Sequence, residues 1–201
     1  QMFLNSGDGV VFRGALGPWY SARSREFHLT RDAARALIGQ VVDGYRKIHG
    51  VAPKELFIHG RQRFSDEEWE GFCEAIPTET KRFVGVRIRS SQDLRLFRPT
   101  VDVPVLRGTA VTLSKREGYL WTTGYVPRLR TYPGFETPKP LLVEINREHG
   151  LGTDWTERDL LQVMQDVLGL TKVNYNSCDY ASGLPVTLKF ADRVGEILLA
   201  S

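Results

Sequence analysis

The sequence predicts one α/β domain in which helices cover both faces of a mixed β-sheet. Two stretches, 29–49 and 156–169, repeat apolar residues at helical spacing, and segments rich in β-branched and aromatic residues lie between them. The 201 residues suffice to bury a core, and the 41% hydrophobic and 25% charged fractions are typical of a globular protein. No apolar run reaches the roughly 20 residues that a membrane-spanning helix needs.

The first half of the chain alternates strands and helices. Thr30 is a candidate N-cap and Gly50 a terminator for the long helix between them. A capping box that begins at Ser65 opens the next helix. The elements expected here are a hairpin at 2–13, a helix at 29–49, a strand at 55–59, a loop at 60–64 and a helix at 65–75.

The second half is richer in strands. Thr156 is expected to cap a helix that Gly169 ends, and Pro185 suits the first position of a final helix. A proline-containing surface loop is expected at 126–140. The other elements expected here are strands at 82–89, 108–113, 118–124 and 141–145.

Positive charge is concentrated in the middle of the chain. Residues 79–130 hold 11 Lys and Arg against 4 Asp and Glu, although the net charge of the whole chain is only +3. A basic region on a nearly neutral chain is the pattern expected of a surface that follows phosphates. A solvated basic face without a ligand would give the same count.

Near the end of the chain, polar and apolar residues alternate. Lys172, Asn174 and Asn176 alternate with Val173 and Tyr175. In an extended segment this places one cation and two amides on a single side. Such a side suits contacts with phosphates and sugars.

The cysteines and histidines indicate neither a disulfide framework nor a metal site. Cys73 and Cys178 lie in unlike contexts, and the four histidines lack the spacing of metal ligands. We therefore expect reduced thiols and a cytoplasmic protein.

Several landmarks occur in the order seen in a known family. They are the hairpin with residues 14–20, the helix 29–49, the strand ending in His59-Gly60-Arg61, the strands at 107–109 and 119–125, the Lys172-to-Asn176 run and the Pro185 helix. This order resembles the PIWI domain of prokaryotic Argonautes over essentially the whole chain. The resemblance implies an RNase H-like mixed sheet flanked by helices, with 1–201 as the C-terminal part of a PIWI domain. The family's first strand and its MID domain are expected to lie outside this chain.

The resemblance also bears on catalysis. Active Argonautes cut with acidic residues that hold two Mg²⁺ ions. By register, one of these acids falls on Gly60, and another falls close to His28, two residues from Glu26. Asp192 keeps the last acid, although it also suits an exposed position on a helix. Loss of the other acids implies a catalytically inactive domain, most like the short type of prokaryotic Argonaute.

Nucleic-acid contacts are expected from cations and amides. Arg61 and Arg63 follow the degenerate Gly60 position, where cations repel a metal and attract a phosphate, unless they only solvate a loop. The resemblance implies that the C-terminal carboxylate of Ser201 helps to bind Mg²⁺ at the 5′ phosphate of the guide. The complete set of expected nucleic-acid contacts is Arg61, Arg63, Arg107, Arg128, Arg130, Lys172, Asn174 and Asn176.

Three functions remain open at this stage. The resemblance favours guide-directed binding, with a guide RNA, a single-stranded DNA target and an APAZ-containing effector protein that carries a SIR2, TIR or nuclease domain, in defence against plasmids or phage. An active nuclease is the alternative, with Glu26 and Asp66 as shifted acids. A protein-interaction module, docking an acidic partner on the basic middle, is the third.

Overall fold

The structure is a computed structural model of residues 1–201. It describes residues 2–3, 9–10, 19–21, 26–99, 102–132, 136–150, 154–173 and 183–191. Four of the expected site residues lie outside the described residues: Asn174, Asn176, Asp192 and Ser201. The chain divides into two compact units, 1–86 with 145–154 and 87–144 with 155–201.

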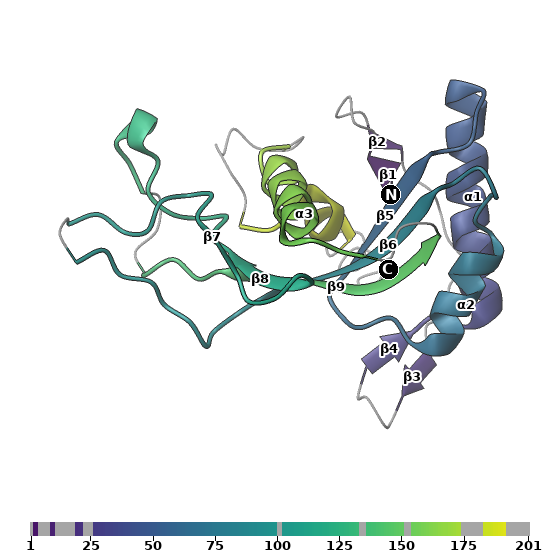
Figure 1. The fold of residues 1–201 in the computed structure, drawn as a ribbon, viewed down its shortest axis with the longest axis horizontal. Coiled ribbons are helices and arrows are strands. Elements are labelled where there is room, and N and C mark those ends of the chain that lie inside the picture. Colours follow the sequence, from purple (N-terminus) through teal and green to yellow (C-terminus); the bar gives the residue numbers. More distant parts are fainter. Residues whose placement is uncertain are drawn as a thin grey trace, which may run out of the picture. The chain divides into compact units, whose positions relative to one another are not determined.

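A five-stranded sheet is the main β-structure, in the order β5-β6-β9-β8-β7 (Figure 1). The N–H groups of Lys81 and Arg82 donate to the Lys54 carbonyl, which places the starts of β5 and β6 side by side and makes the two strands parallel. β8 runs antiparallel to β7 and to β9, so the sheet is mixed, as predicted. The bounds are β5 Glu55–Gly60, β6 Arg82–Ser90, β7 Ala110–Thr112, β8 Glu117–Leu120 and β9 Leu141–Gly150.

Two short antiparallel pairs precede the sheet. The first confirms that a hairpin forms in the predicted region, with Met2 opposite Val10. The second places Trp19 opposite His28. Their bounds are β1 Met2–Phe3, β2 Gly9–Val10, β3 Trp19–Ser21 and β4 Glu26–His28.

In the first unit, helices α1 (Arg31–His49) and α2 (Asp66–Glu74) pack against each other. Gly71 permits the close approach, because a Cβ there would lie 2.2 Å from the Arg31 carbonyl oxygen. The predicted ends of α1 are confirmed: Thr30 accepts a hydrogen bond from the Ala33 N–H, and Gly50 has a φ of 73°. One hydrophobic core cluster of this unit consists of Ala34, Ile38, Val42, Phe64, Trp69, Phe72 and Phe83.

In the second unit, helix α3 (Glu157–Leu170) packs on β7 and β8 (Figure 1). The contact is close at Gly118, where a Cβ would lie 2.5 Å from the Met164 Cε. The predicted cap at Thr156 is confirmed as a capping box with Asp159. The predicted end at Gly169 is wrong, because the helix continues to Leu170 and is capped by Thr171.

Other differences from the predictions lie in the strands and the terminal segment. β9 runs five residues beyond the predicted 141–145, whereas β8 ends at Leu120 rather than 124. The loop at 126–140 contains a short 3-10 helix, Pro127–Leu129. The described part of the Pro185 helix covers 186–191, with Val186 and Leu188 buried. No helix within the described residues has the length and hydropathy to cross a membrane.

Candidate functional site

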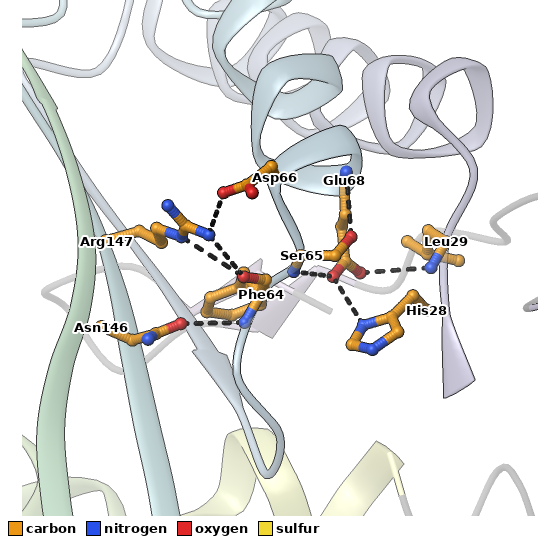
Figure 2. A network of polar contacts seen from close by, with 8 residues as sticks. All are labelled: His28, Leu29, Phe64, Ser65, Asp66, Glu68, Asn146 and Arg147. Carbon is orange, nitrogen blue, oxygen red and sulfur yellow. Dashed lines mark hydrogen bonds and ion pairs between the residues drawn. The ribbon is translucent and has the colours of Figure 1, made fainter. Parts of the chain in front are cut away.

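The loop between β5 and α2 is fixed at one residue, Phe64 (Figure 2). The Phe64 N–H donates to the Asn146 Oδ1 at 2.8 Å. The Phe64 carbonyl accepts from the Arg147 Nε at 3.3 Å and from its Nη2 at 3.2 Å. Both backbone polar groups of Phe64 are therefore satisfied by side chains of β9, more than 80 residues away in sequence.

The Phe64 ring occupies the space that side chains at two glycines would need. A Cβ at Gly60 would lie 2.9 Å from the ring, and a Cβ at Gly85 would lie 2.8 Å from it. Phe64 is only 8% exposed, and its ring centroid lies 6.0 Å from that of Trp69 and 5.9 Å from that of Phe72. The position where the resemblance places a catalytic acid is therefore filled by an aromatic ring.

Arg61 and Arg63 lie in this loop, directly after β5 ends at Gly60, and both are exposed. Asp66, the first residue of α2, forms an ion pair with Arg147. The guanidinium of Arg147 thus contacts the residue before Ser65, at the Phe64 carbonyl, and the residue after it, at the Asp66 carboxylate. The loop that carries the two exposed arginines is held at its C-terminal end.

His28 and Glu68 form a buried pair at the starts of α1 and α2 (Figure 2). The His28 Nδ1 lies 3.5 Å from the Glu68 Oε2, and the two residues are 5% and 8% exposed. Burial raises the pKa of Glu68, while hydrogen bonds from the N–H groups of Leu29 and Ser65 and the contact with His28 act in the opposite direction. The pair joins the entry of α1 to the capping box of α2, which gives His28 a structural function.

His59 precedes Gly60 at the end of β5, and burial lowers its pKa to about 4. Because an unfolded histidine titrates near pH 6.5, the unfolded state binds the extra proton as the pH falls from about 6.5 to 4. We expect the stability that depends on neutral His59 to be complete above pH 6.5. About 2–3 kcal/mol of it should be lost by pH 4.5.

Urea denaturation at pH 7 and pH 4.5 measures this loss. In His59→Gln, whose side chain stays neutral, the difference between the two pH values should shrink by the same amount. An equal difference in the wild type and the variant would contradict the assignment to His59.

Arg107 has a structural contact in the second unit. Its Nη2 donates to the Thr171 Oγ1 at 2.5 Å, and Thr171 is fully buried at the C-terminal end of α3. The next residue, Gly108, has a φ of 90°, which favours glycine. Arg107 therefore braces this turn against α3, and its contact with a phosphate stays a prediction.

The other expected cations of the second unit are exposed. Arg128 lies in the 3-10 helix and Arg130 caps it with a φ of 49°. Lys172 lies in the turn that ends α3, where its N–H donates to the Gly169 carbonyl at 3.0 Å. Lys172 is therefore in a turn rather than in an extended segment, and the prediction of an extended segment is wrong at this residue.

Asn146 and Arg147 were missed by the sequence analysis. The predicted strand ended at Ile145, because the residues after it are polar. An Asn-Arg pair at the end of an apolar strand was the available signal, but its partner could not be identified without the fold. Within the described residues, no three His, Cys, Asp or Glu side chains form a group suited to a metal ion.

Comparison with known proteins finds similarity at the level of structure. No protein-family model matches the chain, and no curated protein matches it. The Clostridium butyricum Argonaute, solved bound to a guide DNA and a 19-mer target DNA, matches 87% of this chain with a TM-score of 0.64 and 17% identity. The Marinitoga piezophila Argonaute, solved in complex with a 5′ OH guide RNA, matches 81% of it with a TM-score of 0.53 and 17% identity.

These similarities confirm the predicted fold class. The mixed five-stranded sheet with its flanking helices is an RNase H-like α/β fold, and its structural neighbours are prokaryotic Argonautes. The matched region covers 21% of one Argonaute chain and 22% of the other, so this chain spans about a fifth of each.

Proposed function

We propose that the chain is a PIWI domain that holds a guide–target duplex without cutting it. The proposal rests on what is observed in the β5–α2 loop. An aromatic ring fills the Gly60 position, where a catalytic acid is expected, and two exposed arginines follow it on a fixed backbone. The fold shared with two Argonautes solved with guide strands supports guide-dependent binding of nucleic acid.

The chemistry of the expected positions supports a domain that does not cleave. Two-metal hydrolysis needs several carboxylates that converge on the ions. Gly60 supplies no ligand, and His28 is buried against Glu68. Asp66, one of the two shifted acids that an active nuclease would use, is paired with Arg147. Asp192 alone would not hold two metal ions.

The finer parts of the proposal rest on the family resemblance. On this basis we propose that residues 1–201 form the C-terminal part of the PIWI domain of a short, inactive Argonaute that acts in the cytoplasm. The guide is RNA, the target is single-stranded DNA, and the Ser201 carboxylate helps to hold Mg²⁺ at the 5′ phosphate of the guide. Pairing with the target signals to an APAZ-containing effector in defence against plasmids or phage.

The test is a binding and cleavage assay with a guide-paired target in the presence of Mg²⁺ or Mn²⁺. We expect the duplex to be bound and to stay intact. Because each phosphate contact releases counterions, Arg61→Ala/Arg63→Ala should make the slope of log K against log salt shallower by roughly 2. Metal-dependent cleavage by the wild type would contradict the proposal.

A matched control removes the same charge from another surface of the first unit. Arg35→Ala/Arg46→Ala deletes two exposed arginines of α1 that form surface ion pairs. Its salt slope should stay close to that of the wild type. Equal slopes for the two double variants would show that Arg61 and Arg63 act only through net charge.

A further inference from the structure

We infer that Asn146 and Arg147 are positioning residues that set the Arg61–Arg63 loop for phosphate binding. This inference rests on the proposed function and assigns a function to two residues of β9 that the sequence did not reveal. Figure 2 shows both side chains directed at Phe64 from the same strand. Phe64 directly follows Arg63, so its backbone fixes the C-terminal end of the loop.

Several contacts fix the position of Phe64. The Asn146 Oδ1 accepts from the Phe64 N–H, and the Arg147 guanidinium donates to the Phe64 carbonyl. The ring of Phe64 is buried against Gly60 and Gly85. Backbone and side chain are therefore fixed together, as a pre-set binding loop requires.

Direct contact with a phosphate is a poorer explanation for these two side chains. Arg147 directs its Nε and Nη2 to the Phe64 carbonyl, and its Nη2 also to the Asp66 carboxylate. A bidentate contact with a phosphate would compete with these bonds. Asn146 carries no charge, so it cannot contribute to the salt dependence except through other residues. Their effect on binding should therefore pass through Arg61 and Arg63.

A double-mutant cycle on the full chain, with a guide–target duplex as the probe, tests this. Asn146→Ala leaves the net charge unchanged. At about 0.1 M salt we expect it to weaken binding about tenfold and to make the salt slope shallower by roughly 1, because each lost phosphate contact has about that effect. In the Arg61→Ala/Arg63→Ala background, the same change should alter affinity less than about twofold.

Arg147→Lys gives a second route if Asn146→Ala folds poorly. Lysine keeps the charge but lacks the planar fork that spans the Phe64 carbonyl and Asp66. We expect weaker binding and a shallower salt slope at constant charge, again only when Arg61 and Arg63 are present.

The control is Thr80→Ala, in the same unit but at the starts of β5 and β6. The buried Thr80 hydroxyl donates to the Pro53 carbonyl at 2.7 Å, so its loss also removes a hydrogen bond that fixes a loop. Affinity for the duplex should stay within about twofold of the wild type.

The outcomes separate the inference from the proposed function. Absence of duplex binding by the wild type would overturn the proposed function. If Arg61→Ala/Arg63→Ala weakens binding but Asn146→Ala and Arg147→Lys do not, the positioning inference is wrong and the proposed function stands. Equal affinity losses from Asn146→Ala in both backgrounds would show a general structural effect and would also overturn the inference.

Discussion

Gly60→Asp is expected to lower the free energy of unfolding by about 2–4 kcal/mol and to create no metal-dependent nuclease. A Cβ at this position would lie 2.9 Å from the Phe64 ring. The Phe64 ring has little room to move away from the new Cβ, because it also lies against Gly85 and packs near Trp69. The new carboxylate would displace a buried aromatic side chain and would directly precede Arg61 in the chain. One added acid would not by itself supply the converging carboxylates that two metal ions need.

Urea denaturation with and without Mg²⁺ measures the stability part of this prediction, and a cleavage assay of a guide-paired target with Mg²⁺ measures the nuclease part. Gly39→Asp is a matched control, because a Cβ at Gly39 would meet no heavy atom within 4 Å apart from its chain neighbours and the nearby backbone of α1. It should change stability by less than about 1 kcal/mol, since surface substitutions have small effects. A Gly60→Asp variant that is as stable as the wild type, or that is stabilised by Mg²⁺, would contradict our interpretation of the site.

The sequence predicted the helices well because their ends depend on local chemistry. Thr30, Ser65 and Thr156 each accept a hydrogen bond from a backbone N–H three residues ahead, a relation that spacing alone reveals. The end of α3 was missed, because glycine at position 169 did not adopt the left-handed conformation that ends a helix.

The second half of β9 was not predicted, because its polar residues form contacts with residues far away in the sequence. Asn146 and Arg147 are polar, and the predicted strand stopped before them, whereas in the fold they belong to β9 and bind Phe64. Long-range pairs of this kind leave no periodic signal in the sequence. The sequence identified Arg61 and Arg63 as candidates, but only the structure shows how their loop is held.

The basic middle of the chain also needed the structure for its interpretation. Arg87 forms an ion pair with Glu144 at 3.2 Å, and Arg107 donates to Thr171. Both guanidiniums thus have functions inside the second unit. A count of charges over 79–130 therefore overstates the cations that a phosphate surface could use, whereas Arg128 and Arg130 are exposed as expected.

Phe64→Ala is expected to have the largest effect on stability, lowering the free energy of unfolding by about 3–5 kcal/mol. The residue is only 8% exposed, so truncation removes a buried ring and leaves a cavity. The same truncation at Phe97, which is 72% exposed, is the matched control and should cost less than about 0.5 kcal/mol. A small loss at Phe64 would mean that the ring does not anchor the loop.

Gly60→Asp and Phe64→Ala should also interact. If the Phe64 ring is what excludes a side chain at Gly60, the Phe64→Ala background provides room for the new Cβ. Gly60→Asp should then cost about 1 kcal/mol or less in that background, compared with about 2–4 kcal/mol in the wild type. Additive losses in the double variant would show that the Gly60 position rejects aspartate for a reason other than the ring. Non-additive stability losses would show that one aromatic residue, Phe64, both excludes an acid at position 60 and anchors the loop that carries Arg61 and Arg63.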